Sequence, residues 1–388
     1  MRPDDLAEHQ QHNLTWVDAG AGTGYHAYVP PPLPPDIAFD TRLVGKLSAA
    51  DRALGELAGA GRALPNPYLL AQTMIRREAV LSSRIEGTQA TLSELVLFEV
   101  EGPSDRNSPD VQEVYNYVTA MEYVLAADRR LPLSLGLLRE AHEILLTGVR
   151  GGYATPGEFR RSQNWIGPPG CSLNTATYVP PPPTRLWDCL DPFEKYLHTD
   201  HALPPLITIA CAHYQFEAIH PFVDGNGRVG RLLVTLLLIE WGLLPAPLLD
   251  LSAYLEPRRS EYYDRLLAVS VSGDWVGWIA FFLDVIAAQA ANATERASQL
   301  RTLRDDMRES VTTARSSALA PKLVDALFAT PAMTIGRAAR LLDVTHKAAR
   351  DNITKLLDAG IVVEVDSPGR VRYFLAPRII QVVNGELP

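Results

Sequence analysis

The sequence has few cysteines, no uninterrupted apolar run long enough for a membrane and no excess of positive charge. Its three cysteines are too widely spaced for a zinc knuckle and odd in number for a disulfide framework, so we expect a reducing, cytoplasmic setting. The polar, acidic start of the chain lacks the apolar segment of a secretory signal. The formal net charge of −9 offers no overall attraction to nucleic acid or anionic lipid, although a local basic face remains compatible with it.

The longest apolar stretch, residues 232–249, is interrupted by a glutamate, a glycine and two prolines. These interruptions favour a buried helix that stops at the prolines over a membrane span, and we expect no membrane partner. The length of 388 residues allows two or three packing units, and 47% hydrophobic with 21% charged residues is ordinary for a globular protein.

Helical periodicity dominates the chain, so we expect a mainly α fold. The proline-rich residues 28–35 are expected to be extended. Two short apolar pieces, Asn164–Ile166 and Thr177–Val179, lie in a Gly- and Pro-rich stretch and predict a hairpin. Helices are expected over residues 42–60, 67–86, 92–98, 110–127, 134–146, 186–198, 205–218, 228–240, 254–270 and, with a break, 275–318.

The end of the chain has a pattern of its own. Three helical stretches between residues 321 and 359 precede two short apolar strands, 361–365 and 371–375, that flank an Asp-Ser-Pro-Gly turn. Three helices and a small hairpin predict a winged helix-turn-helix. We therefore expect three parts: an amino-terminal helical region over 1–109, a central core over 110–317 and a winged helix domain over 318–388.

Residues 220–231, HPFVDGNGRVGR, are typical of a tight loop that opens a helix. Gly225 and Gly227 flank Asn226 and are able to adopt backbone angles that other residues avoid. Successive backbone N–H groups in such a turn form a concave anion site, and the start of the following helix adds partial positive charge. A glycine turn capped by asparagine is the plain structural alternative, but it leaves the fixed order of the polar residues unexplained.

The charged side chains of this loop indicate phosphate chemistry. Arg228 and Arg231 are three residues apart, so they share a helix face and are able to bind the same polyphosphate. Asp224 places a carboxylate beside that anion, a position that suits Mg²⁺. His220 is the only base of the loop that works near neutral pH, and a histidine beside bound phosphate is able to take a proton from an attacking hydroxyl.

The loop resembles the signature of the Fic family, H-P-F-x-D/E-G-N-G-R-x-x-R, at every specified position, and Ala212-His213, Phe216-Glu217 and Ile219 before it also fit. The resemblance implies a helical bundle with a β-hairpin flap that transfers AMP from ATP to Ser, Thr or Tyr hydroxyls of proteins. It further implies the following site: His220 as general base, Asp224 as magnesium ligand, Gly225, Asn226 and Gly227 as anion hole, Arg228 and Arg231 on the β- and γ-phosphates, and Val229 and Gly230 as further ATP-binding positions.

A second motif, SSRIEG at residues 82–87, ends a strong helical pattern at Gly87. A glutamate at a helix carboxyl end is disfavoured by about 0.3–1 kcal/mol, and a side chain in water is its plain explanation. The motif also resembles the inhibitory S/T-x-x-x-E-G/N signature of Fic proteins. That resemblance implies that Glu86 pairs with Arg231 and blocks placement of the γ-phosphate. Positioning of water for AMP removal is a related alternative.

Two further segments resemble parts of Fic proteins. The hairpin over residues 164–179 resembles the flap that aligns the target segment, and a plain structural hairpin fits it nearly as well. Residues 252–263 resemble the segment that helps to enclose the nucleoside, which makes Tyr262 and Tyr263 candidate ATP contacts. At least one of these tyrosines is better explained as a core aromatic, and Arg258 stands where many relatives have Asn.

The carboxyl-terminal pattern leaves several partners open. His346, Lys347 and Arg350 lie on the candidate recognition helix, where basic residues are compatible with duplex DNA. Protein recognition or formation of a homodimer fits this weakly charged part about as well. The function is then either an AMP transferase acting on a protein hydroxyl, its own included, or a DNA-binding regulator whose core senses nucleotide. An intact His220 favours the enzyme, although transfer of another nucleotide or phosphoryl group stays open.

Overall fold

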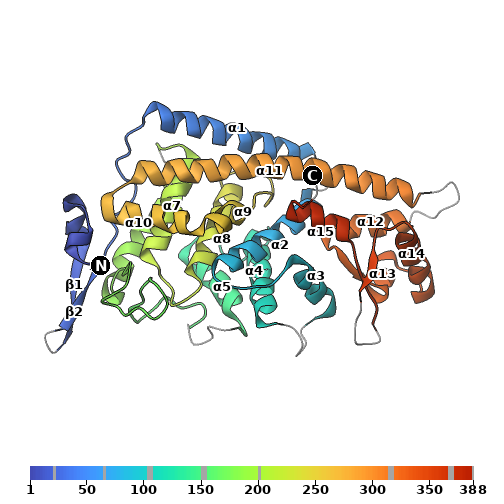
Figure 1. Ribbon diagram of the computed structural model, residues 1–388, viewed down its shortest axis with the longest axis horizontal. Helices are drawn as coiled ribbons and strands as arrows, with labels where there is room; N and C mark the ends of the chain where they lie inside the picture. Colours follow the sequence, from blue (N-terminus) through green and yellow to red (C-terminus); the bar gives the residue numbers. More distant parts are fainter. Residues whose placement is uncertain are drawn as a thin grey trace. The chain divides into compact units, whose positions relative to one another are not determined.

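The computed structural model describes residues 1–20, 23–63, 67–102, 108–149, 155–199, 202–312, 319–365 and 371–386 (Figure 1). These residues are mainly helical, as expected, with one two-stranded and one three-stranded sheet. The chain forms two compact units, which divide it differently from the three consecutive parts expected from the sequence. The first unit comprises 1–54, 119–243 and 251–288, and the second comprises 55–118, 244–250 and 289–388.

The first unit begins with a hairpin that the sequence analysis did not foresee. Strand β1 (Leu14–Gly20) pairs with β2 (Thr23–Tyr28) in antiparallel register, Leu14 opposite Tyr28. The remaining elements of this unit are helical. They are α5 (Leu135–Leu146), α6 (Leu186–His198), α7 (Pro205–Ile219), α8 (Asn226–Glu240), α9 (Ser252–Leu255) and α10 (Arg259–Ser272). Three of the division points between the units fall within α1 (Thr41–Ala63), α4 (Pro109–Leu125) and α11 (Trp275–Ser310), and the other two bound residues 244–250, between α8 and α9.

Helices α7 and α8 form the centre of the first unit, where they pack against each other. All of α7 is buried except its first residue and Glu217, and α8 is buried from Arg228 to Leu238. A helix that is apolar on all sides belongs in a core, which explains this burial. The short loop that joins α7 to α8 is therefore anchored at both ends in buried, mutually packed helices.

The expected flap hairpin is reduced to a single antiparallel bridge between Ile166 and Tyr178. Each residue donates its N–H to the other's carbonyl, at 2.8 and 3.0 Å. Prolines at 168–169 and 180–183 flank the bridge, and because proline has no N–H, they prevent a longer ladder. The Tyr178 hydroxyl donates to the Ala218 carbonyl at 2.7 Å, which fixes the bridge beside the end of α7.

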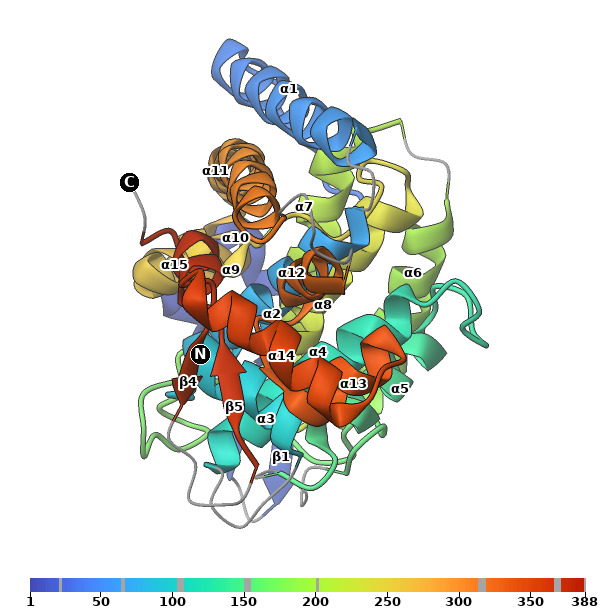
Figure 2. The same cartoon turned by 90° about the vertical axis from the view of Figure 1, so that its right-hand side faces the viewer.

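The second unit contains α2 (Pro67–Ile85), α3 (Leu92–Glu101) and the carboxyl-terminal elements (Figure 2). Its antiparallel sheet has the strand order β3-β5-β4. The helix α15 that follows was not expected, and the tip of the expected hairpin, residues 366–370, lies outside the described residues. The carboxyl-terminal elements are α12 (Leu319–Ala329), β3 (Ala332–Thr334), α13 (Ile335–Leu342), α14 (His346–Asp358), β4 (Val363–Val365), β5 (Tyr373–Leu375) and α15 (Pro377–Asn384).

Helix α11 runs without the expected break from Trp275 to Ser310, and residues 313–318 lie outside the described part of the chain. By length and composition alone, α11 is the one described helix that would fit across a membrane. More than half of its apolar stretch is buried, as in the core helix of a globular protein, so this is a weak sign of a membrane span.

Candidate active site

His220 caps the carboxyl end of α7 in a left-handed conformation, with φ 50° and ψ 59°. Its N–H donates to the Phe216 carbonyl at 3.0 Å, and its ring Nδ1 lies 3.2 Å from the Glu217 carbonyl oxygen. A carbonyl oxygen only accepts, so Nδ1 carries the proton of the neutral ring and the lone pair lies on Nε2. The helix end thus sets both the direction and the tautomer of this imidazole.

The loop after His220 is braced by the side chain of Asn226, which is 2% exposed. Asn226 accepts from the Phe222 N–H at 2.8 Å and donates to the Phe222 carbonyl at 2.9 Å. Gly225 precedes α8 at φ 77°, an angle that favours glycine, and its N–H donates to the Asp224 carboxylate at 2.6 Å. The Asn226 side chain is therefore a brace, and the candidate anion donors are the first backbone N–H groups of α8, which lack partners within the helix.

Arg160 and Asn164 support the loop from outside, and the sequence analysis did not assign them to the site. The Arg160 N–H donates to the Pro221 carbonyl and its Nε to the His220 carbonyl, both at 2.9 Å. Burial lowers the pKa of Arg160 to about 10, so the side chain stays charged at neutral pH. Asn164 Nδ2 donates to the Phe222 carbonyl at 2.8 Å. Two polar side chains close to the Ile166–Tyr178 bridge thus hold carbonyls of the loop between α7 and α8.

His142 is a third residue that was not predicted for the site, and it acts as a structural brace. Its Nδ1 accepts from the Gly157 N–H at 3.0 Å, which leaves Nε2 as the donor to the Asp224 carbonyl at 3.0 Å. The ring stacks on Phe222 with centroids 3.8 Å apart. Burial lowers the pKa of His142 to about 4, so the ring is neutral and both nitrogens are committed. The one feature of the sequence that sets His142 apart is its place among the apolar positions of α5.

Arg228 and Arg231 lie on α8 and are 3% and 1% exposed. Asp224 is half-buried in the loop before them. Among the residues that the structure describes, no group of three or more His, Cys, Asp or Glu could hold a metal ion. A single carboxylate still fits Mg²⁺, because Mg²⁺ bound with nucleotides takes most of its ligands from phosphate and water.

Val229 and Gly230 are buried where α7 and α8 pack together, and the ATP-binding role expected for them stays a prediction. Val229 is fully buried. A Cβ on Gly230 would lie 2.3 Å from Glu217 Oε1 and 3.2 Å from Phe216 Cδ1, so this glycine permits the close approach of α7 and α8. The Gly230 carbonyl also lies 3.2 Å from His213 Nδ1. Both residues serve helix packing.

Tyr262 and Tyr263 occupy different environments. Tyr262 is 1% exposed, and its hydroxyl lies 2.8 Å from His213 Nε2. Its ring stacks against that of His213, so the structure places it in the aromatic core, as expected for at least one of the two tyrosines, and its contact with ATP stays a prediction. Tyr263 is 39% exposed, with the Arg259 guanidinium 5.6 Å above its ring. Of the two tyrosines, only Tyr263 is available to a ligand in this structure.

Glu86 is exposed in the turn directly after α2. Its N–H donates to the Ser83 carbonyl at 3.0 Å, and Gly87 follows at φ 110°, which ends the helix where the sequence indicated. Glu86 belongs to the second unit and Arg231 to the first. The pairing of these two side chains therefore stays a prediction.

Comparison with known proteins identifies the elements around this loop. Residues 44–126 match the model of the Fic/DOC family N-terminal region, and residues 132–238 match that of the Fic/DOC family. A protein named "Protein adenylyltransferase Fic" from Drosophila virilis is 33% identical over 208 residues, 52% of this chain and 39% of that protein. The Drosophila melanogaster protein of the same name is 32% identical over 52% of this chain and 38% of its own length.

Two solved structures share the fold. A Fic family protein from Desulfovibrio desulfuricans superposes with a TM-score of 0.57 and 20% identity, over 88% of this chain and 98% of its own. Fic-1 from C. elegans superposes with a TM-score of 0.52 and 20% identity, over 67% of this chain and 74% of its own. These superpositions show that the chain has the Fic fold. The chain spans about two fifths of the length of the matched Drosophila proteins.

Proposed function

We propose that this chain is a protein adenylyltransferase of the Fic/DOC family that moves AMP from ATP onto a protein hydroxyl. The names of the Drosophila relatives support this activity. The observation that carries the proposal is the placement of His220: with Nδ1 bonded to the Glu217 carbonyl, the ring keeps its lone pair on Nε2. That base precedes a braced turn at the start of a helix, where phosphate binds favourably.

In the proposed reaction, the hydroxyl oxygen of the target attacks the α-phosphorus of ATP. His220 Nε2 accepts the hydroxyl proton while the bond from the α-phosphorus to the bridging oxygen of the β-phosphate breaks. The products are a phosphodiester between AMP and the target, and pyrophosphate. General base catalysis of this kind typically contributes about 10²- to 10⁴-fold in rate.

The buried arginines provide the phosphate site in this proposal. Arg228 and Arg231 are buried on one helix, and in this proposal their guanidinium groups bind the β- and γ-phosphates, which fixes the α-phosphorus near the base. Asp224 would hold Mg²⁺, which supplies positive charge against the phosphate oxygens when it is bound. By the family resemblance, Glu86 inhibits transfer by pairing with Arg231, in competition with the γ-phosphate.

Three proteins test the proposal: the native chain, Glu86→Gly and His220→Ala. Each is incubated with Mg²⁺, a cell lysate and α-labelled ATP, with α-labelled CTP, GTP and UTP as parallel reactions. We expect weak labelling by the native chain, strong labelling by Glu86→Gly from ATP alone and none by His220→Ala. Equal labelling by the native and His220→Ala proteins contradicts the catalytic role. Labelling from another nucleotide assigns a different donor, and loss of label from pre-modified protein reveals AMP removal.

A second candidate function concerns the carboxyl-terminal elements, which we propose to be a winged helix. The order α12-β3-α13-α14-β4-β5 with an antiparallel sheet supports this interpretation. His346, Lys347 and Arg350 are exposed near the start of α14, which favours contact with the phosphates of duplex DNA. Gel retardation on mixed-sequence DNA at physiological salt is the test, and absence of any shift contradicts DNA binding.

A further inference from the structure

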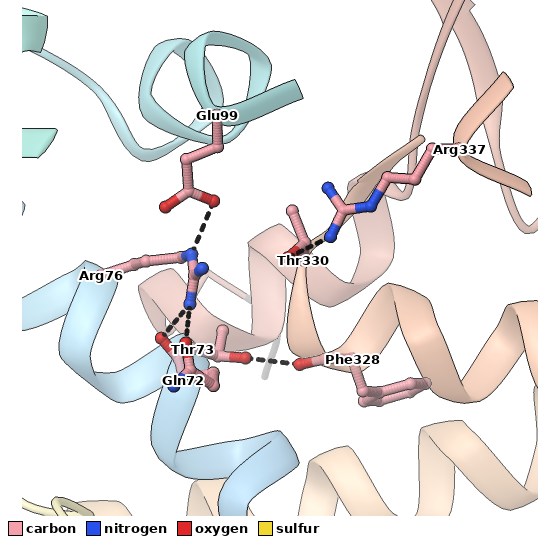
Figure 3. Close-up of polar contacts among 7 residues, drawn as sticks. All are labelled: Gln72, Thr73, Arg76, Glu99, Phe328, Thr330 and Arg337. Carbon is pink, nitrogen blue, oxygen red and sulfur yellow. Dashed lines mark hydrogen bonds and ion pairs between the residues drawn. The ribbon is translucent and has the colours of Figure 1, made fainter. Parts of the chain in front are cut away.

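The helix that leads to Glu86 is held by the carboxyl-terminal elements of its own unit. Helices α12 and α15 pack against α2 (Figure 2). Thr73 of α2 is 1% exposed, and its hydroxyl donates to the Phe328 carbonyl at 2.6 Å (Figure 3). Phe328 lies in the last turn of α12, where backbone carbonyls lack partners within the helix. Thr73 therefore supplies a buried hydrogen bond that ties α2 to the end of α12.

One turn further along α2, Arg76 forms a buried ion pair. Its Nε lies 2.9 Å from Glu99 Oε2 of α3, and both side chains are 8% exposed. Its Nη1 donates to the carbonyl of Gln72 at 2.7 Å and to the Gln72 side chain at 2.8 Å, so the guanidinium is fixed on its own helix (Figure 3). Such a pair holds two elements in one arrangement, because separating the partners leaves a buried charge uncompensated.

The carboxyl-terminal elements also contribute a charge to this cluster. Arg337 of α13 interacts electrostatically with Glu99 and with Arg76, and its pKa is lowered mainly by burial. Its Nη2 donates to the Thr330 hydroxyl at 3.1 Å, close to the end of α12 (Figure 3). In addition, α3 packs against β3. Glu99 is thus the anion of a cluster in which one arginine comes from α2 and another from the carboxyl-terminal elements.

These contacts lie on the same helix as the inhibitory motif. Arg76 lies about 14 Å along α2 before Ile85, the last residue of the helix, at 1.5 Å per residue, and Glu86 follows directly. A continuous helix over this distance transmits a displacement at one end to the other. We propose that Thr73 and Arg76 are positioning residues through which the carboxyl-terminal elements, residues 319–386, hold α2 and keep Glu86 in its inhibitory place. This inference rests on the proposed function, because it requires that Glu86 restrain AMP transfer.

The test compares Thr73→Val and Arg76→Met in the full chain, assayed with α-labelled ATP, Mg²⁺ and a cell lysate. Thr73→Val keeps the shape of the side chain and removes only the hydroxyl, so it is the variant that retains the fold most readily. Loosening α2 is expected to raise labelling about five-fold or more, the usual lower range for coupling between sites. The same substitutions in the Glu86→Gly background are expected to give no further rise. A rise that depends on Glu86 separates a positioning role from a purely structural role, which would change labelling alike in both backgrounds.

Arg304→Met is the matched control. Arg304 Nε lies 2.7 Å from Asp325 Oδ1, so this substitution also removes an arginine that pairs with the carboxyl-terminal elements, but from α11 and not from α2. It is expected to leave labelling at the native level. Thermal melting of each variant identifies any that fail to fold.

The outcomes separate this inference from the proposed function. If Glu86→Gly raises labelling while folded Thr73→Val and Arg76→Met stay at the native level, the positioning role is wrong and the inhibitory role stands. A rise in Arg304→Met equal to that in Arg76→Met also overturns the positioning role. If Glu86→Gly itself does not raise labelling, the failure lies in the proposed function.

Discussion

The amide of Asn226 spans the catalytic loop to Phe222, accepting from its N–H at 2.8 Å and donating to its carbonyl at 2.9 Å. Both groups belong to the backbone, so one side chain sets the shape of the turn before any ligand arrives. A loop that is already ordered binds an anion without a further ordering cost. Aspartate could not replace Asn226, because an ionised carboxylate has no donor for the Phe222 carbonyl.

We expect Asn226→Ala to lower the free energy of unfolding by about 1–3 kcal/mol, since it leaves a buried backbone donor without its partner. AMP transfer should fall more than stability alone explains, because the turn loses its shape. Denaturant unfolding and labelling from ATP measure the two effects. Asn384→Ala is the control, because Asn384 is exposed and its side chain donates to Glu386 at 2.9 Å, away from the loop. Equal effects of both substitutions would contradict the bracing role.

Two buried histidines predict loss of stability in mild acid. Burial lowers the pKa of His142 to about 4 and that of His213 to about 3, from an ordinary value of 6.5. Below pH 6.5 these two histidines are protonated in the unfolded chain but stay neutral in the folded chain. The free energy of unfolding therefore falls as pH drops. Each histidine contributes about 1.4 kcal/mol per pH unit over this window.

His142→Gln keeps a donor and an acceptor in the side chain. It should reduce the slope of the unfolding free energy against pH between pH 6 and pH 5, and the part of that slope due to His213 should remain. Urea unfolding at pH 7, 6 and 5 gives the free energies for both proteins. An unchanged slope in the variant would show that His142 is protonated in the folded state.

Gly230 predicts a steric effect at the crossing of α7 and α8. Gly230→Ala places a methyl group 2.3 Å from Glu217 Oε1 and 3.2 Å from a Phe216 ring carbon, so both side chains must move. We expect a loss of about 1–3 kcal/mol of unfolding free energy. Gly336 is the matched control, because its nearest neighbouring atom would lie 4.0 Å away and alanine favours a helix by about 0.5–1 kcal/mol. Thermal melting that moves both variants in the same direction would refute this packing role.

Tyr262→Phe separates a core role from a nucleotide contact. Loss of the hydroxyl removes a buried hydrogen bond to His213 and should cost about 0.5–1.5 kcal/mol of stability. The KM for ATP should stay unchanged, because the ring is buried. Tyr263→Ala is the companion variant, since Tyr263 is 39% exposed. Steady-state kinetics with ATP as the varied substrate are the measurement. A raised KM for ATP in Tyr262→Phe would show that Tyr262 contacts the nucleotide.

The helices and the catalytic loop could be predicted from the sequence because both depend on local patterns. Helical spacing located α6 to the residue and α7 to within one residue, and Gly225 marked the turn, whereas Gly227 proved to belong to the first turn of α8. The hairpin β1–β2 carries no such pattern, since Trp16 is exposed and only the last two residues of β2 are buried.

Residues whose roles arise only in three dimensions could not be predicted in this way. Arg160 and His142 meet the loop across 60 and 82 residues of sequence, so no local spacing points to them. The same limit explains the domain boundaries, because α2 and α12 are distant in the chain but pack in one unit. Val229 and Gly230 resemble the rest of the loop in sequence, and only the packing of α7 on α8 shows why they are buried.

The most direct test of the central claim is a crystal structure of the Glu86→Gly protein with Mg²⁺ and a non-hydrolysable ATP analogue. The account predicts the triphosphate at the start of α8, between the loop backbone and the two buried arginines, with His220 Nε2 directed at the attack position on the α-phosphorus. A nucleotide bound elsewhere, or an imidazole turned away from that phosphorus, would contradict it.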